Sequence, residues 1–213
     1  MAVVSLSSFR TEPGRLADHV EAAAEALGHL RRLGFQAVNF QAVAGTDIGT
    51  ISTSINYASN AAYATGMQQI LADEQWQEFW GRASAGGAAV QVEGSLFVDV
   101  DPTFAAGPDR PLGVVMATQW RPRSGRIMDF MGNVMGSFGH ITRLGGAPRA
   151  MQSIIGAHPM TVLVTVGLAD LDAYGAYADA IGSDEQWQAF WGGVMADPTA
   201  DLIRSGLYLN ISG

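Results

Sequence analysis

The side chains that could carry out chemistry in this 213-residue chain are few, and its four histidines come first. They are His19, His29, His140 and His158, and no two of them have the HxxxH spacing or another spacing typical of metal ligands, so we expect no metal site. His29 and His140 each come shortly before a glycine that is expected to end a helix. An imidazolium is favourable at a helix C-terminus because of the helix dipole, so we interpret this pair as structural. A general base and an axial haem ligand are the functional alternatives.

Two amino acids that often carry chemistry are absent from the sequence. The chain has no cysteine, and all twelve of its basic residues are arginines. The first absence excludes thiol nucleophiles, disulfides and cysteine-type metal sites, and the second excludes Schiff bases and a P-loop lysine. Any chemistry must therefore come from histidines, carboxylates, tyrosines, hydroxyls, arginines, backbone amides or a bound cofactor.

The charge and the hydropathy pattern limit the partners that we expect. The net charge is −8 and basic residues are sparse, which argues against binding to nucleic acid. No apolar run approaches the length of a membrane span, and the beginning of the sequence lacks the features of a secretion signal. We therefore expect a cytoplasmic protein with neither a nucleic-acid nor a membrane partner.

One stretch of the sequence occurs twice. "DEQWQEFWG" begins at Asp73 and "DEQWQAFWG" begins at Asp184, 111 residues later. The same offset aligns "GHLRRLG" at Gly28 with "GHITRLG" at Gly139 and needs no gap. The chain is therefore an internal duplication of about 100 residues per copy, large enough for a small domain. We predict repeat 1 over residues 1–101, a proline-rich linker over 102–111 and repeat 2 over 112–213.

Each copy has the pattern of an α+β unit with the element order β-α-β-β-α-β. The expected strands are 2–9, 36–43, 48–57 and 89–100 in repeat 1, and 112–120, 149–155, 160–168 and 202–211 in repeat 2. An amphipathic helix follows the first strand, and a second helical region carries the tryptophans. Ser183 and Gln186 match a capping box, so a new helix is expected to start there. This order is that of a ferredoxin-like fold, in which an antiparallel sheet has helices on one face.

The repeated tryptophan segment has the spacing of one face of a helix. Trp76, Phe79, Trp80 and Ala83 follow i, i+3, i+4 and i+7, and the second copy keeps this spacing. We interpret the rings as anchors of the second helical region. An aromatic cage for a ligand is the alternative.

The sheet of each copy would leave one face without helices, and the two bare faces are expected to pack against each other. Alternation assigns to this face Thr50, Ser52, Ser54 and Asn56 of the third strand, and Ser5, Ser7 and Phe9 with Met116, Thr118 and Trp120 of the first strands. On the last strands it assigns Glu93, Phe97 and Asp99, with Arg204, Tyr208 and Asn210. Glu93 and Arg204 are equivalent positions of opposite charge, and we predict that they lie on facing sheets. Two unrelated exposed charges are the alternative.

In element order and in the "DEQWQ-x-FW" segment, the chain resembles the dimeric α/β-barrel superfamily in a tandem-repeat form. It is similar to NIPSNAP-like and antibiotic-biosynthesis-monooxygenase-like proteins, and the superfamily also includes polyketide cyclases and chlorite-dismutase-type haem proteins. The resemblance covers nearly the whole chain in element order. It implies two tandem ferredoxin-like repeats whose antiparallel sheets pack face to face as an α/β barrel within one chain.

The function that we expect is that of a cofactor-independent enzyme acting on a bulky apolar molecule, aromatic or polyketide-like, by oxygenation, cyclisation or isomerisation. His140 or Tyr208 would act as acid or base, and Arg204 would stabilise an oxyanion. The expected substrate-binding residues are Trp120, Met128, Met131, Met135 and Glu93. The pocket would lie either between the sheets or between a sheet and its helices.

Two alternatives to the enzyme remain open. One is a protein that binds haem or another hydrophobic ligand, which an absorbance spectrum would reveal. The other is a non-catalytic stress or interaction protein, which predicts a filled interior without a cavity. The helix "RIMDFMGNVMGSFGHI" of repeat 2 is apolar almost all round, so it would either line a pocket or be covered by a second copy in a homo-oligomer.

Overall fold

The structure is a computed structural model that describes residues 2–104 and 110–213, so residues 105–109 of the expected linker lie outside the described residues. Repeat 1 consists of β1 (Val3–Thr11), α1 (Leu16–Arg32), β2 (Gln36–Gly45), β3 (Thr50–Tyr57), α2 (Asn60–Ala72), α3 (Glu74–Gly86) and β4 (Ala89–Asp99). Repeat 2 consists of β5 (Val114–Pro122), α4 (Ile127–Arg143), β6 (Ala147–Ile155), β7 (Val162–Leu168), α5 (Leu171–Ser183), α6 (Glu185–Ala196) and β8 (Ala200–Asn210). The expected order is confirmed, and the second helical region of each repeat is divided into two helices.

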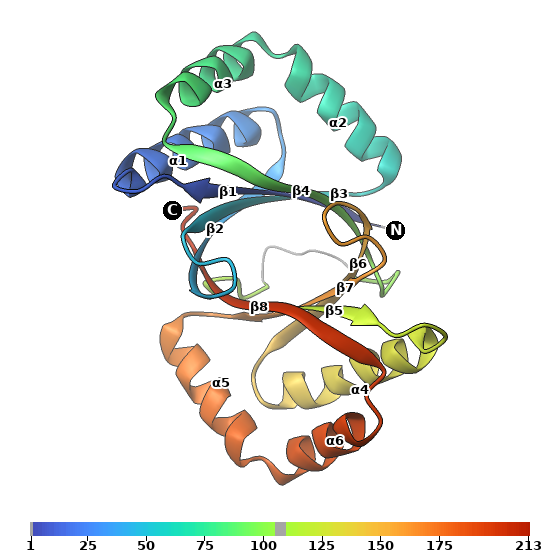
Figure 1. Ribbon diagram of the computed structural model, residues 1–213. Coiled ribbons are helices and arrows are strands. Elements are labelled where there is room, and N and C mark those ends of the chain that lie inside the picture. The colour runs from blue at the N-terminus through green and yellow to red at the C-terminus, as the bar shows by residue number, and fades with distance from the viewer. Residues whose placement is uncertain (1, 105–109) are drawn as a thin grey trace.

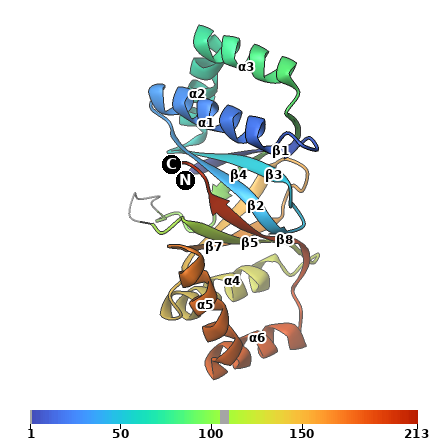
Figure 2. The same ribbon diagram turned by 90° about the vertical axis from the view of Figure 1, so that its left-hand side faces the viewer.

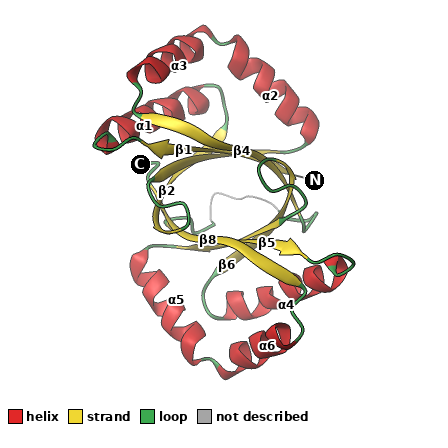
Figure 3. Cartoon of the chain, in the orientation of Figure 1, coloured by secondary structure: helices red, strands yellow, loops and turns green. Residues whose placement is uncertain are grey.

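All eight strands join into one closed antiparallel barrel, in the order β1-β3-β2-β8-β5-β7-β6-β4. Each repeat supplies a four-stranded sheet, and the pairs β2–β8 and β4–β6 join the two sheets at their edges. These pairs satisfy backbone groups that an open sheet edge would leave unpaired. The helices lie outside the barrel, with α1–α3 on one side and α4–α6 on the opposite side (Figures 1, 2 and 3). The predicted intrachain α/β barrel is thus confirmed.

The first helix of each repeat packs one face on the sheet. In α1 this face buries Ala23, Leu27, Leu30 and His19, and the corresponding apolar core contains Val3 and Ile55 of the strands. Both first helices end before a glycine with positive φ, +87° at residue 34 and +95° at residue 145. Residues with a Cβ rarely adopt such angles, which is why glycine ends these helices. His29 and His140 lie in the last turns, as predicted.

The tryptophan helices α3 and α6 start at equivalent aspartates. The carboxylates of Asp73 and Asp184 accept hydrogen bonds from the backbone N–H groups of Trp76 and Trp187, at 2.8 and 2.7 Å. The prediction of a new helix here is confirmed, but the expected cap at Ser183 is wrong. That serine ends α5 and donates its hydroxyl proton to a carbonyl within that helix. A carboxylate is the better cap because its negative charge also complements the helix dipole.

The faces of the third and last strands are as predicted, whereas those of the first strands are reversed. Residues of β1 and β5 that point into the barrel are Val4, Leu6 and Ser8, with Val115, Ala117 and Gln119. Met116, Thr118 and Trp120 instead face the helices of repeat 2. Both strands are central in their sheets and carry apolar and polar residues on each face, so alternation could not decide which face is which.

No helix in the described parts of the chain combines the length and the apolar character that crossing a lipid bilayer requires.

Candidate functional site

The described residues line one cavity inside the barrel and one between the sheet and the helices of each repeat. The barrel cavity, inside the strands, has a volume of about 120 Å³. The repeat 1 cavity lies between the sheet and α1 and α3, with about 320 Å³, and the repeat 2 cavity lies between the sheet and α4–α6, with about 470 Å³. The last is the largest of the three and is lined mainly by apolar side chains.

Aromatic side chains form much of the wall of the repeat 2 cavity. They come from the sheet and from all three helices: Trp120, Phe130, Tyr177, Trp187, Phe190 and Trp191. Trp187 and Trp191 stack with ring centroids 5.9 Å apart, and Trp120 meets Trp191 edge to face at 6.0 Å. The tryptophan segment therefore anchors α6 and also lines a cavity, so the two interpretations of it are compatible.

Most polar groups of this wall are already engaged within the protein. Trp120 donates its indole proton to Thr118, at 2.9 Å, and Ser137 donates to a backbone carbonyl at 2.6 Å. Burial raises the pKa of Tyr177 to about 12, so its phenol stays protonated at neutral pH. The cavity thus offers a mainly apolar surface, and Tyr177 is one of the residues that line it.

The repeat 1 cavity is different because a histidine lines it. His19 of α1 is buried, and its Nδ1 lies 2.8 Å from the hydroxyl of Thr11. Burial lowers the pKa of His19, which favours the neutral ring. Our sequence analysis assigned no role to His19. The signal that could have found it is the duplication itself, because the equivalent residue of repeat 2 is Phe130.

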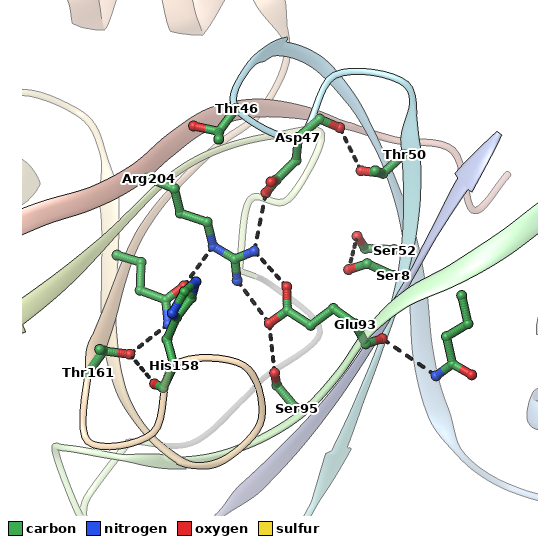
Figure 4. Close-up of polar contacts among 12 residues, drawn as sticks. Ser8, Thr46, Asp47, Thr50, Ser52, Glu93, Ser95, His158, Thr161 and Arg204 are labelled. Atoms are coloured by element: carbon green, nitrogen blue, oxygen red, sulfur yellow. Dashed lines mark hydrogen bonds and ion pairs between the residues drawn. The ribbon is translucent and has the colours of Figure 1, made fainter.

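Glu93 and Arg204 meet across one mouth of the barrel, which confirms the predicted pairing (Figure 4). They lie on β4 and β8, and three strands lie between these two in each direction around the barrel. The two Nη atoms of Arg204 lie 2.6 and 3.0 Å from the carboxylate oxygens of Glu93, and Nε donates to Gln119 at 2.6 Å. Burial acts to raise the pKa of Glu93, but the hydrogen bonds from Arg204 and Ser95 outweigh it and the pKa is lowered.

Tyr208 belongs to the same cluster. It donates its hydroxyl proton to Asp47 at 2.6 Å, and Asp47 also lies 3.6 Å from Arg204. Burial and the hydrogen bond to Asp47 raise the pKa of Tyr208. The groups of this mouth bind one another and join strands of both repeats, so Arg204 and Tyr208 have little capacity left for a ligand.

His140 lies in neither sheet–helix cavity nor the barrel. Its ring packs against Phe190 and Trp187, with centroids 5.0 and 6.2 Å away, and its Nδ1 is buried without a hydrogen-bond partner among the described residues. The structure therefore does not bring His140 together with Tyr208 and Arg204. The three predicted acid–base and oxyanion groups do not share one site.

The methionines of α4 are also divided. Met128 is 78% exposed and Met135 is 41% exposed, so both lie on the outer face of the helix. Met131 packs against the core cluster of Phe130, Val134, Ala150 and Val162 and is not among the residues that line the repeat 2 cavity. Of the predicted substrate-binding residues, Trp120 lines this cavity and Glu93 lies at the barrel mouth. Periodicity could not separate the two faces because α4 is apolar on both.

A haem group would need an axial ligand from the wall of one of these cavities. Haem iron is usually held by a His, Cys, Met or Tyr side chain. The described wall of the repeat 2 cavity has no histidine, but Met116, Met195 and Tyr177 line it. The wall of the repeat 1 cavity has His19 but, within the described residues, no arginine that could pair with the buried propionates of a haem. No group of three or more His, Asp or Glu in the described chain is placed to hold a metal ion.

Comparison with known proteins finds the fold and no close relative. No family model and no curated protein matches the sequence. An anthrone oxidase-like protein is similar in structure, with 15% identity over 98% of this chain and 91% of that one, at a TM-score of 0.66. A proposed monooxygenase from Lactobacillus acidophilus has 8% identity over 99% and 94%, at 0.63. A haem-binding protein from Thermus thermophilus has 10% identity over 98% and 90%, at 0.55.

At these identities the likeness is one of fold. Such structures include small-molecule enzymes and haem-binding proteins, so the fold by itself does not select an activity. The chain has the fold of these structures, and two ferredoxin-like repeats form its α/β barrel within one chain.

Proposed function

We propose that the protein is a cofactor-independent enzyme that binds a bulky, apolar, aromatic small molecule in the repeat 2 cavity. The observation that carries the proposal is the volume of about 470 Å³ enclosed by aromatic side chains. Sites for small molecules usually have about 300–1,000 Å³ and mostly apolar walls. Protein interiors are otherwise close-packed, so a space of this size between helices and sheet is not an ordinary packing defect. A purely structural protein would be expected to fill it.

The chemistry of the wall favours oxygenation among the three reaction classes. Dioxygen is apolar and can enter such a cavity with little loss of hydration. The protonated hydroxyl of Tyr177 can donate a hydrogen bond to a substrate oxygen on which negative charge develops. This role replaces the one expected of Arg204, which is engaged in the barrel. The likeness to an anthrone oxidase-like protein and a proposed monooxygenase supports the same choice.

Two measurements test this proposal, a binding titration and an assay with anthrone. The titration uses the neutral fluorescent probe N-phenyl-1-naphthylamine. In the assay, anthrone and dioxygen in equal amounts give anthraquinone and water, as the methylene carbon is oxidised and dioxygen is reduced. We expect the fluorescence of the bound probe to rise and anthraquinone to form faster than in buffer.

Equivalent positions provide matched variants. Val194 and Ala83 line the repeat 2 and repeat 1 cavities. Val194→Phe fills the repeat 2 cavity and is expected to weaken probe binding by about tenfold or more, or about 1.4 kcal/mol. Ala83→Phe should leave the affinity for this probe unchanged. Equal binding by wild type and Val194→Phe would place the probe elsewhere and refute the proposal.

Haem binding is the second candidate, because one of the similar structures is a haem-binding protein. An absorbance spectrum of the purified protein decides between the two. We expect no Soret band, also after addition of haemin and gel filtration. A band that survives gel filtration and is lost in the Val194→Phe variant would replace the enzyme proposal by haem binding in this cavity.

A further inference from the structure

The two repeats provide an internal comparison, since each residue of repeat 1 has an equivalent 111 positions later. At the repeat 1 cavity, His19 pairs with the hydroxyl of Thr11. The equivalents in repeat 2 are Phe130 and Pro122, neither of which can make this hydrogen bond. Both partners are thus present in one repeat and both are absent from the other. Repeat 2 keeps the fold without either partner, which indicates that the pair of His19 and Thr11 has a role other than supporting the shared fold.

The geometry leaves one nitrogen of His19 available to the cavity. The residue is only 5% exposed, and its Nδ1 lies 2.8 Å from Thr11 Oγ1. When Nδ1 carries the proton and donates to that oxygen, Nε2 keeps its lone pair. Nε2 makes no hydrogen bond to a described residue, and the ring forms part of the cavity wall. Nε2 is not fully buried. It is therefore an accessible acceptor on a residue that lines a cavity of about 320 Å³, and a ligand with a donor group can bind there.

The remaining wall indicates what kind of ligand would fit. Small side chains of the helices create the space, among them Ala22, Ala26 and Ala83, and Phe9 and Trp80 offer aromatic rings. Burial lowers the pKa of His19, so the ring is a neutral acceptor at neutral pH. The described wall has no carboxylate and no arginine, so it offers no partner for an ion that arrives charged. A neutral aromatic molecule that carries one acidic hydroxyl group matches this surface.

We propose that the repeat 1 cavity is a second small-molecule site, that it takes an aromatic molecule with an acidic hydroxyl, and that Nε2 of His19 accepts the hydroxyl proton. In this step the O–H bond breaks and an N–H bond forms at Nε2. The electron pair stays on the ligand oxygen, and the imidazolium continues to donate from Nδ1 to Thr11. The site differs from the repeat 2 cavity in place and in chemistry, so it does not depend on the function proposed there.

A chromophoric phenol makes the proton transfer visible. In 4-nitrophenol the phenol and the phenolate absorb at different wavelengths, and 4-nitroanisole has the same ring without the hydroxyl. Near the pKa of free 4-nitrophenol, we expect the bound probe to show more of the phenolate spectrum in the wild type than in His19→Phe. The imidazole nitrogen signals of His19 in NMR should report protonation with 4-nitrophenol and not with 4-nitroanisole.

Three variants make the test specific. His19→Phe installs the residue that repeat 2 carries at the equivalent position, so the fold should tolerate it. It should abolish the spectral shift and weaken 4-nitrophenol binding by about tenfold, while 4-nitroanisole is bound as before. Thr11→Val keeps the side-chain shape and removes the partner of Nδ1, so the shift should decrease while binding persists. Ala83→Phe should block 4-nitrophenol and leave N-phenyl-1-naphthylamine bound, which separates this site from the repeat 2 cavity.

Other outcomes overturn the inference. Equal affinity of 4-nitrophenol and 4-nitroanisole for the wild type and for His19→Phe would show that the cavity binds aromatic rings without a contribution from His19. A phenolate shift that persists in His19→Phe would assign the proton to another group. Loss of 4-nitrophenol binding in Val194→Phe, and not in Ala83→Phe, would place the phenol in the repeat 2 cavity. The first two results do not bear on whether the repeat 2 cavity binds its own ligand, and the third would support a ligand site there.

Discussion

At the barrel mouth, equivalent positions of the two repeats carry opposite charges. An unchanged duplication would carry the same charge at both positions. Arg204 lies beside Glu93 and Asp47. By the 111-residue offset, Glu93 corresponds to Arg204 itself and Asp47 corresponds to His158. His158 in turn lies near Glu93, and the two are shown together in Figure 4. Two copies of one charge facing each other across the pseudo-twofold axis would repel in a poorly solvated space. Divergence of the copies has replaced that repulsion by a paired network.

A variant of Glu93 tests how much this network contributes. Glu93→Gln keeps the shape and removes the charge, which leaves the mostly buried Arg204 with weaker partners. We expect a loss of about 3 kcal/mol in the free energy of unfolding, measured by urea titration. The pKa of Glu93 is lowered from its ordinary 4.5, so its contribution is present above that pH and is lost as the pH falls through the lower folded value. The variant should therefore lose less stability than the wild type on acidification below about pH 4.5.

The control for Glu93 removes both charges. Glu93→Leu combined with Arg204→Leu leaves no unpaired ion, so it should be less destabilising than Glu93→Gln alone. The charge exchange Glu93→Arg with Arg204→Glu should recover little, because it would place the new carboxylate beside Asp47. Equal stability of Glu93→Gln and the wild type at neutral pH would contradict the role given to the pair.

At the scale of elements, one small arrangement occurs in both repeats and places the tryptophan helix. Arg143 at the end of α4 binds Asp184 at 2.7 Å, and Asp184 in turn caps α6. The hydrogen bonds from Arg143 and then from the backbone of Trp187 lower the pKa of Asp184 to about 2. Arg32 and Asp73 form the same contact in repeat 1. Because α6 starts at this fixed point, the rings of Trp187 and Trp191 line the repeat 2 cavity.

Variants of Asp184 separate the cap from the ion pair. Asn is as good a cap as Asp, so Asp184→Asn should retain most of the helix start, whereas Asp184→Ala should lower the melting temperature by a few degrees. Asp184→Ala should also weaken binding of N-phenyl-1-naphthylamine. Asp73→Ala should lower the melting temperature to a similar degree and leave this binding unchanged. Equal effects of both alanine variants on the probe would mean that the cap does not position the cavity wall.

On the scale of the molecule, the two repeats share one barrel. The strand pairs β2–β8 and β4–β6 connect them, and the ion pair of Arg149 in β6 with Asp99 in β4 adds a second charged link, at 2.7 and 2.8 Å. If the sheet of one repeat unfolded, both edge strands of the other sheet would lose their strand partners. The domain bounds stay a prediction, but the shared strand pairs imply that the repeats do not unfold independently.

We therefore expect a single cooperative unfolding transition. Differential scanning calorimetry should give equal calorimetric and van't Hoff enthalpies. Leu27→Ala in repeat 1 and Ile141→Ala in repeat 2 each remove a buried side chain, and each should shift the whole transition to lower temperature. Two resolved transitions, with each variant moving only one of them, would show that the repeats are separate folding units.

The outer face of α4 remains without an assigned partner. Met128 and Met135 are exposed there, and self-association through this helix stays a prediction that native mass spectrometry can test.

The sequence alone determined the duplication, the element order and the charge pair. An offset that holds without gaps requires two copies of one fold, and equivalent positions in two facing copies lie near a common axis, which is why Glu93 and Arg204 could be paired in advance. The third strand alternates polar and apolar residues, so its faces were also decided by local pattern.

Only the tertiary structure decided where the sites lie. Central strands such as β5 carry apolar and polar residues on both sides, so the closure of the barrel, and not alternation, placed Trp120 against the helices. A cavity depends on the distance between helices and sheet, which is set by packing of residues far apart in the chain. For the same reason the sequence drew attention to His140, which recurs in both copies but packs between rings, and passed over His19, which lines a cavity only once Thr11, α1 and α3 are brought together.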